Sequence, residues 1–574
     1  MLSSPAFERN DLWSGPARDD ASGVWISVSP SLVFHGHRGT NPSSGVRGGR
    51  QDTGADRPPP GAPAVPRRSR VPNHEDRPMA SSLTKDSAST PGSEKTFFGH
   101  PRGLATLFMT EMWERFSFYG MKALLPLYLV APGGMDMDAA TATAIFSIYM
   151  AMVYLLAMPG GWFADRLWGP RKTITIAALV IMAGHITLAL PGQAVFFLGL
   201  VLVAMGSGLL KANISTMVGH LYDGPDDPRR DGGFTVFYIG INLGAFFAPL
   251  AIGTVGEKVN WHLGFALAAF GMALGLAQFL LGGRHLSERS SVVPKPVERP
   301  ELMSLLRKAM LWIIAAVVFY GVTIATGVYT LNWAIVPITV AGLVIPIWVL
   351  AKIKRDKELT DVEQSRMTAY IWFFVAAAVF WMIYDQGAST VALFGKNSTD
   401  TSIFGFDFPV SWYQSVNPVL IMALAPVAAF LWMALNRRDK EPTTVVKFAI
   451  GLVITGASFF VFLLPLSMAG DGEKVGAYWM VAIYFMHTVG ELCVSPVGLS
   501  VTTKMAPAKY ASQMLGVWFL AVTAGDCTTG LLSTAGVDLN KTGVVAMEAT
   551  LAVVAGVAVY MYRKKVKALM GEVN

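Results

Sequence analysis

The sequence predicts an all-α polytopic membrane protein with about 14 transmembrane helices. Of its 574 residues, 52% are hydrophobic and 15% are charged, and the mean hydropathy is +0.44. Soluble globular proteins carry about 25% charged residues, so this composition is typical of a chain that lies mostly in lipid. From residue 97 onward, apolar runs long enough to cross a bilayer alternate with short polar breaks. Together these features predict a bundle of membrane-spanning helices.

Two longer polar connectors divide the predicted spans into groups of six, two and six. The spans are expected near 103–131, 139–163, 172–190, 193–219, 234–254, 261–282, 309–328, 331–353, 367–394, 411–435, 444–466, 475–500, 511–535 and 542–562. The expected organisation is a six-helix bundle at 97–282, a linker at 283–308, two helices at 309–353, a linker at 354–366, a second six-helix bundle at 367–565 and a tail at 566–574.

Residues 1–96 differ in composition from the rest of the chain. They are rich in Pro, Gly, Ser, Arg and Asp and show no sustained apolar periodicity, so we expect a disordered tail. The stretch that begins at Met79 resembles an ordinary polar N-terminus. We therefore expect the true start near Met79.

Lys and Arg concentrate in alternate loops of the predicted bundle. These residues follow the second, sixth, eighth, tenth and last spans: Arg166, Arg171, Lys172, Arg284, Arg289, Lys295, Arg299, Lys352, Lys354, Arg355, Lys357, Arg437, Arg438, Lys440, Arg563, Lys564, Lys565 and Lys567. Loops rich in Lys and Arg face the cytoplasm. We therefore expect a multi-pass protein of the cell membrane, surrounded by lipid, with both termini cytoplasmic. The same loop placement accounts for the net charge of +7, so no nucleic-acid partner is expected.

One predicted span contains a cluster of charges, formed by Glu111, Glu114, Arg115 and Lys122. A charged residue at the centre of a membrane helix costs about 2.5–3.5 kcal/mol on insertion scales, so four would cost roughly 10 kcal/mol. Spacings of three and four put Glu111 beside both Glu114 and Arg115 on the helix surface. A protonated Glu releases the Arg that it held when ionised. The cluster therefore predicts a path for substrate or protons.

Motifs along the chain resemble those of known transporters. The loop Gly160–Lys172 contains a Gly pair and an Asp-Arg-x-x-Gly-x-Arg turn, and it resembles the loop motif of the major facilitator superfamily. Glu111–Gly120 resembles the ExxER signature of the proton-dependent oligopeptide transporter (POT) family. Three further segments resemble the fourth-, fifth- and tenth-helix patterns of that family: Gly208–Asn213, Phe237–Gly244 and Phe485–Leu492. The resemblance covers residues 97–565 and implies the major facilitator fold, with two extra helices between its two six-helix halves.

The resemblance also implies roles for particular residues. The proton-coupling residues it implies are Glu111, Glu114, Arg115, Lys211 and Asp385. The substrate-binding residues it implies are Tyr119, Lys122, Tyr154, Lys211, Asn242, Trp381, Asn417, Glu491 and Trp518. Three positions depart from the family pattern: Lys122 stands where Arg is usual, Phe118 replaces a tyrosine, and Asp385 replaces a glutamate. The isolated His487 is more typical of a structural residue, and it is not assigned a role.

The function implied is a proton-coupled symporter that imports di- and tripeptides by alternating access, with the proton as coupling ion and no other cofactor. Opposite charges would then hold the two ends of a zwitterion. The alternatives are the same fold carrying nitrate, drug-like or other small organic substrates, or a non-transporting peptide sensor. An enzyme is not expected, because no HExxH or GxSxG motif occurs and the two cysteines are solitary. No metal site is expected, and we expect a monomer.

Asp526 lies in the predicted span 511–535, where the family pattern does not lead us to expect an acid. It is either a further proton site or a local partner for the hydroxyls of Thr523 or Thr529, three residues away on each side. The sequence leaves both readings open.

Overall fold

The computed structural model describes residues 96–224, 227–403, 405–469 and 473–573. The predictions for residues 1–95, the disordered tail and the start near Met79, lie outside the described residues. Within the described part, each of the 14 predicted spans coincides with a helix or with a helix and its continuation. Twelve of the described segments are long and apolar enough to cross a membrane, and the first of these, Ala139–Leu188, contains two of the predicted spans.

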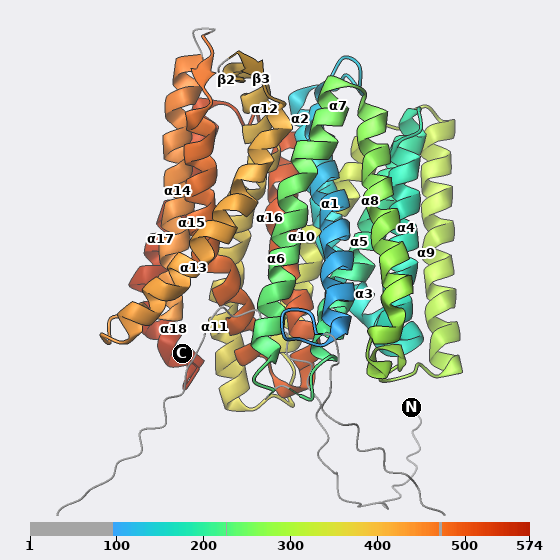
Figure 1. Ribbon diagram of the computed structural model, residues 1–574, viewed down its shortest axis with the longest axis vertical. Helices are drawn as coiled ribbons and strands as arrows, with labels where there is room; N and C mark the ends of the chain where they lie inside the picture. The colour runs from blue at the N-terminus through green and yellow to red at the C-terminus, as the bar shows by residue number, and fades with distance from the viewer. Residues whose placement is uncertain (1–95, 225–226, 404, 470–472, 574) are drawn as a thin grey trace, which may run out of the picture. The chain divides into compact units, whose positions relative to one another are not determined.

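The first half contains six spans (Figure 1). Two of them consist of consecutive helical segments: a turn at Leu156 separates two α-helices in one, and each of the two contains a short stretch of π-helix. In order they are α1 (Arg102–Val130), α2 (Ala139–Leu155) with α3 (Ala157–Phe163) and η1 (Ala164–Trp168), α4 (Gly169–Leu188), α5 (Gln193–Gly219), α6 (Arg230–Ala248) with η2 (Pro249–Gly253) and α7 (Thr254–Lys258), and α8 (Trp261–Leu281).

A connector with two short 3₁₀ turns, η3 (Gly282–His285) and η4 (Glu288–Ser291), leads to the two extra helices. The first, α9 (Arg299–Ala325), is apolar yet almost wholly exposed, with Trp312 at 77%. The second, α10 (Asn332–Lys354), packs against α2 of the first half and α16 (Ala511–Thr534) of the second. An apolar helix with so little protein around it is suited to contact with lipid chains. The two helices therefore differ in their surroundings, although both are long and apolar enough to cross a membrane.

The second half contains the remaining six spans. They are α11 (Asp361–Tyr384) with η5 (Asp385–Ala388) and α12 (Thr390–Ser398), η6 (Val410–Ser415) with α13 (Val416–Asn436), α14 (Thr444–Ala469), α15 (Tyr478–Lys504) followed by η7 (Ala508–Tyr510), α16, and α17 (Thr542–Met561). Four two-residue strands lie in the loops: β1 (Thr399–Asp400) pairs with β4 (Val475–Gly476), and β2 (Ser402–Ile403) pairs with β3 (Phe406–Asp407). The span predicted as continuous at 367–394 is interrupted at η5, immediately at Asp385.

One further helix, α18 (Arg563–Met570), lies in the segment that the sequence analysis assigned partly to the C-terminal tail. Its Val566 and Met570 are 1% exposed and pack into a hydrophobic cluster with residues of α11 and α14, whereas its Lys and Arg residues face outward. An eight-residue amphipathic helix is too short to span a bilayer, so the length and hydropathy of apolar runs do not predict it.

Close packing within the first half depends on small residues where helices cross. Gly160 of α3 lies against the backbone of Gly208 and Leu209 of α5, so a Cβ at Gly160 would collide with that backbone. Close approach of backbones through small residues is how membrane helices gain packing energy when lipid is as apolar as their side chains. Of the Gly pair at 160–161, only Gly160 makes such an approach, since a Cβ at Gly161 would meet no neighbour.

The two halves contact each other along α2 and α16, along α6 and α13, and through η2 and η6. The last of these contacts lies at the end of the helices that carries α7, β2 and β3, which we name the strand end (Figure 1). There, Glu257 of α7 accepts hydrogen bonds from the backbone N–H groups of Val410 and Ser411 at 3.0 and 2.9 Å. The indole of Trp412 donates to the Thr254 hydroxyl at 2.8 Å. In this conformation the halves are thus joined at the strand end.

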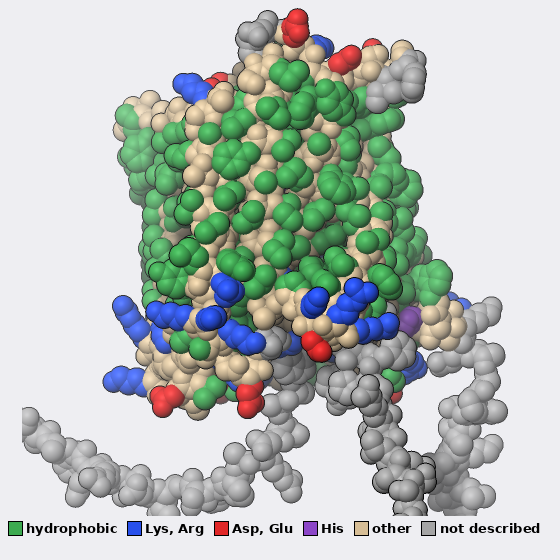
Figure 2. Space-filling model, turned by 90° about the vertical axis from the view of Figure 1, so that its left-hand side faces the viewer, with side chains coloured by type: hydrophobic (Ala, Val, Ile, Leu, Met, Phe, Trp, Pro, Cys, Tyr) green, Lys and Arg blue, Asp and Glu red, His purple; other side chains and the backbone are tan. Residues whose placement is uncertain are grey.

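Lys and Arg side chains gather at the opposite end, which we name the basic end (Figure 2). Between the two ends the face shown in Figure 2 is almost entirely hydrophobic. At the basic end the connector after α8 lies on the η1 loop: Lys295 and Val297 donate backbone hydrogen bonds to the carbonyls of Asp165 and Arg166. Arg166 also forms an ion pair with Glu301 at 2.5 Å. An apolar band with cations at one end is the surface expected of a multi-pass membrane protein.

Candidate functional site

The charge cluster of α1 is buried and contains one more acid than its arginine can neutralise. Arg115 Nε lies 2.6 Å from Glu111 Oε1 and 3.1 Å from Glu114 Oε2. Glu111 and Glu114 are 1% and 0% exposed, and Glu111 Oε2 and Glu114 Oε1 have no hydrogen-bond partner in the part of the chain that the structure describes. The spacing in the helix thus produces the contacts that the sequence predicts. A buried site with a surplus carboxylate favours binding of a proton over a second negative charge.

Lys211 of α5 contacts aromatic rings instead of a carboxylate. Its Nζ lies 3.9 Å from the ring centre of Tyr154 and 4.7 Å from that of Phe118. No ion pair of Lys211 occurs among the described residues. Ring faces attract an ammonium group, and the attraction is stronger where water is excluded. Phe118, which stands in place of a tyrosine, therefore supplies a ring face to this lysine.

Lys122 and Asp385 form an ion pair that joins the two halves. Lys122 Nζ of α1 lies 2.7 Å from Asp385 Oδ1 of η5, and the two side chains are 11% and 5% exposed. These residues are 263 positions apart. The sequence analysis assigned Lys122 to the substrate and Asp385 to the proton, without pairing them. Here each is the other's partner.

Glu491 of α15 is held by neutral donors from two neighbouring helices. Tyr384 of α11 donates its hydroxyl to Glu491 Oε2 at 2.6 Å, and Asn417 of α13 donates its amide to the same oxygen at 3.0 Å. The Asn417 amide also donates a hydrogen bond to the Thr488 hydroxyl oxygen at 2.9 Å. Neutral donors orient the carboxylate without cancelling its charge. Sequence reasoning missed Tyr384, although it is adjacent in the sequence to Asp385, which was assigned a role.

The predicted aromatic and amide residues fall into two groups. Tyr119 and Trp381 lie beside the charged groups, with Trp381 edge-on to Tyr384 at 5.1 Å and Tyr119 edge-on to Phe118 at 5.4 Å. Tyr154 stacks on Phe519 of α16 at 5.8 Å, so this ring contacts both halves.

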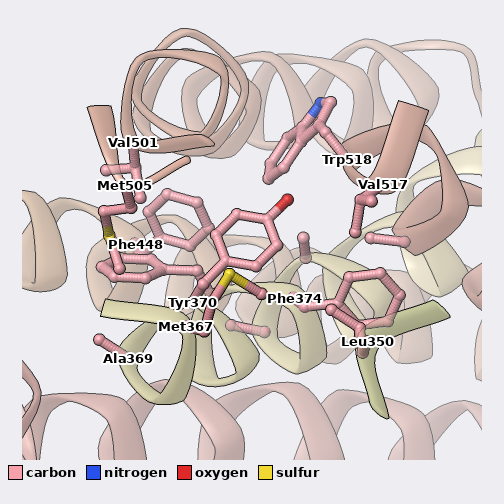
Figure 3. Packing of buried hydrophobic residues seen from close by; sticks show 14 of the residues in the cluster. Leu350, Met367, Ala369, Tyr370, Phe374, Phe448, Val501, Met505, Val517 and Trp518 are labelled. Carbon is pink, nitrogen blue, oxygen red and sulfur yellow. The ribbon is translucent and has the colours of Figure 1, made fainter. Parts of the chain in front are cut away.

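Asn242 and Trp518 are placed differently. The Asn242 amide donates to the carbonyl of Tyr238, one turn earlier in its own helix. Trp518 is 3% exposed and packs in the cluster of Figure 3, where it lies near Tyr370 and Val517. Its ring also covers Gly498 of α15. The structure thus places Trp518 in the packed core of the second half.

Two further acids are buried in the second half. Asp526 is 2% exposed, and neither predicted hydroxyl donates to it: Thr523 donates to the carbonyls of Ala151 and Phe519, and Thr529 to that of Met382. Glu548 of α17 is 1% exposed and accepts from the Gln386 amide at 3.1 Å with both oxygens. Sequence reasoning missed Glu548. Its presence as an acid within the predicted span 542–562 could have identified it, as it identified the other buried acids.

Comparison with known proteins adds a consistent picture. Residues 171–548 match the model of a family described as the POT family. The di-/tripeptide transporter of Lactococcus lactis subsp. cremoris is 40% identical over 494 residues, covering 84% of this chain and 99% of that protein. The peptide transporter YePEPT of Yersinia enterocolitica subsp. palearctica is 36% identical over 471 residues, covering 78% and 90%. A crystal structure of a peptide transporter POT in complex with sulfate superposes with a TM-score of 0.79 at 41% identity, covering 83% and 97%.

Proposed function

Because this chain belongs to the POT family, a family of transporters, we propose that it is a symporter that imports di- and tripeptides together with protons. The major facilitator fold with two extra helices supports alternating access between two six-helix halves. The observation that carries the proposal is the separation of opposite charges between the halves. Arg115, Lys122 and Lys211 belong to the first half, and Glu491 belongs to the second.

This separation matches the charges of a peptide. A di- or tripeptide has a carboxylate and an ammonium group at its ends, which lie roughly 3.8 Å apart per residue step. The cations of α1 and α5 are suited to the carboxylate. Glu491 is suited to the ammonium group, because both hydrogen bonds from Tyr384 and Asn417 go to Oε2 and leave Oε1 outside them.

Proton coupling would use the surplus acid of the α1 cluster. Glu111 and Glu114 share Arg115, so protonation of one leaves the other paired. That protonation removes a negative charge that acts on Lys211, which contacts the rings of Tyr154 and Phe118 and has no ion pair among the described residues. Proton entry down the membrane potential supplies about 2.3 kcal/mol per charge per 100 mV. No cofactor other than the proton is required.

The orientation follows from the placement of charge. The basic end would face the cytoplasm, with both termini there, because loops rich in Lys and Arg stay on that side. The strand end, where Glu257 joins the halves, would then be the closed outer side of the cell membrane. We propose a monomer surrounded by lipid.

Transport assays in proteoliposomes test the proposal. The purified full chain should accumulate alanylalanine when the outside is acidic and the inside is negative. Glu114→Gln should lose this driven accumulation while retaining exchange of unlabelled for labelled peptide, because exchange needs no net proton movement. Absence of driven uptake in the wild type, or full driven uptake in Glu114→Gln, contradicts the proposal. Uptake of nitrate or a drug-like compound alone would favour a different substrate, and peptide binding without any transport would favour a sensor.

A further inference from the structure

Asp526 is held beside Asp385 by the packing of α16 on α11. Gly525 lies so close to the backbone of Ala378 and Met382 that a Cβ there would collide with it. One turn later, the Thr529 hydroxyl donates to the Met382 carbonyl at 3.1 Å. These contacts pack α16 against the last turn of α11. Asp385, the first residue of η5, follows that turn directly. Asp526 therefore faces the point where the span is interrupted.

Asp526 and Asp385 are both buried, and two lysines act on Asp526. Asp526 is 2% exposed and Asp385 is 4% exposed, and among the described residues the Oδ2 atom of each has no hydrogen-bond partner. The titratable groups that act on Asp526 or are acted on by it come from four other segments and its own helix: Asp385 of η5, Lys122 of α1, Lys211 of α5, Tyr154 of α2 and Cys527 of α16.

When both acids of this group are ionised, only Asp385 has a cation in contact with it among the described residues. Lys122 is in contact with Asp385 Oδ1 at 2.7 Å, so its charge neutralises that carboxylate. Lys211 instead contacts the rings of Tyr154 and Phe118. A second ionised carboxylate without a contacting cation is strongly unfavourable in a buried site, and two neighbouring carboxyl groups then share one proton. The proton belongs to the pair more than to either residue.

We propose that Asp526 and Asp385 form a proton-binding carboxyl pair, separate from the Glu111–Glu114–Arg115 cluster. In the present conformation Lys122 pairs with Asp385, and Asp526 carries the proton on one carboxyl oxygen. When the halves separate, Lys122 leaves Asp385, and the Asp385 carboxylate also becomes able to bind a proton. The pair then exchanges protons with water on the newly opened side. Only O–H bonds form and break. The part of this inference that concerns transport rests on the proposed function.

Infrared difference spectroscopy of the purified full chain tests the protonation state without any transport. The wild type should show the carbonyl stretch of a protonated carboxylic acid near neutral pH, with a shift in D₂O. Asp526→Asn should lose that band and Asp526→Glu should retain a shifted one. Thr528→Val should leave the band unchanged, because the Thr528 hydroxyl donates to the Ala524 carbonyl within α16. Identical spectra for wild type and Asp526→Asn overturn the proposal. If Asp526→Asn does not fold, the Asp526→Glu spectrum decides instead: a band at the same position as in the wild type overturns the proposal.

Reversal-potential measurements in proteoliposomes test the role in coupling. The number of protons moved per alanylalanine should fall by about one in Asp526→Asn and return in Asp526→Glu, because the amide cannot titrate. An unchanged ratio and pH profile in Asp526→Asn overturn the coupling role. Failure of the wild type to move alanylalanine at all would instead overturn the proposed function, and the infrared band would still decide the state of Asp526.

Discussion

The contact of Glu257 with η6 leads to a measurable prediction about the equilibrium between conformations. Glu257 of the first half accepts the backbone N–H groups of Val410 and Ser411, which are the first two residues of η6 in the second half. The first N–H groups of a helix have no partner within it. Glu257→Ala removes the acceptor of both hydrogen bonds. The conformation closed at the strand end therefore loses two hydrogen bonds, whereas an opened conformation loses none, because these bonds are absent from it.

The magnitude follows from the kind of bond and its exposure. Each hydrogen bond to a charged group contributes about 1.5–3 kcal/mol when buried. Glu257 is partly exposed, so water replaces part of what is lost, and we expect about 1.5–3 kcal/mol for the two bonds together. Because 1.4 kcal/mol is a factor of ten, the equilibrium should shift toward opening by about 10- to 150-fold.

Spin labels across the strand end measure this shift. Val259 and Phe406 are 69% and 58% exposed and lie in the two halves, so labels there should disturb little. In a background without Cys493 and Cys527, the distance distribution of Glu257→Ala should gain a longer component at the expense of the wild-type one. Lys258→Ala removes a charge at the neighbouring exposed position and serves as the matched control. Distance distributions that are identical in Glu257→Ala and wild type would refute the reasoning.

Three further predictions concern the site, the core and the basic end. Tyr384→Phe should weaken binding of alanylalanine about tenfold in calorimetry, because Glu491 loses one of its two hydrogen-bond donors. The control Tyr370→Phe, in the packed core, should leave the affinity unchanged, and equal affinities of Tyr384→Phe and wild type would contradict the role assigned to Tyr384. Gly498→Val should lower stability in thermal unfolding by about 1–3 kcal/mol, because the added atoms collide with the Trp518 ring, and an unchanged midpoint would show that the ring moves freely. Hydrogen bonds from Lys509 and Tyr510 hold the pKa of Asp356, in the connector between α10 and α11, below its ordinary value. Asp356→Asn should therefore be less stable than wild type at neutral pH, and the difference should disappear as the pH falls through the lowered pKa; a difference that persists in acid would contradict this.

The extent of the spans was predictable from sequence because a helix in lipid must satisfy its own backbone. That requirement makes length and hydropathy sufficient signals, and the 14 predicted spans coincide with helices in the described residues. Contacts within one helix were predictable as well. Glu111 and Arg115 are four residues apart, and they meet at 2.6 Å because the helical repeat places them on one face.

Contacts between distant segments depended on the tertiary structure. Hydropathy marks Lys122, Asp385, Glu491 and Asp526 as unusual, but it carries no information about which of them become neighbours. Helix crossings decide that: α1 meets η5, so Lys122 pairs with Asp385, and α16 is clamped on α11, so Asp526 lies beside the same carboxylate. The same packing places Trp518 in the core.

The sequence by itself therefore determined the membrane class, the spans and the presence of buried charges whose insertion cost requires partners. Only the tertiary structure decided which partners they have: ring faces for Lys211, neutral donors for Glu491, and a carboxylate from the other half for Lys122. The physical reason is the range of each constraint. Backbone hydrogen bonding and side-chain periodicity act over a few residues, whereas the neutralisation of a buried charge depends on whichever helix the fold brings within about 3–4 Å.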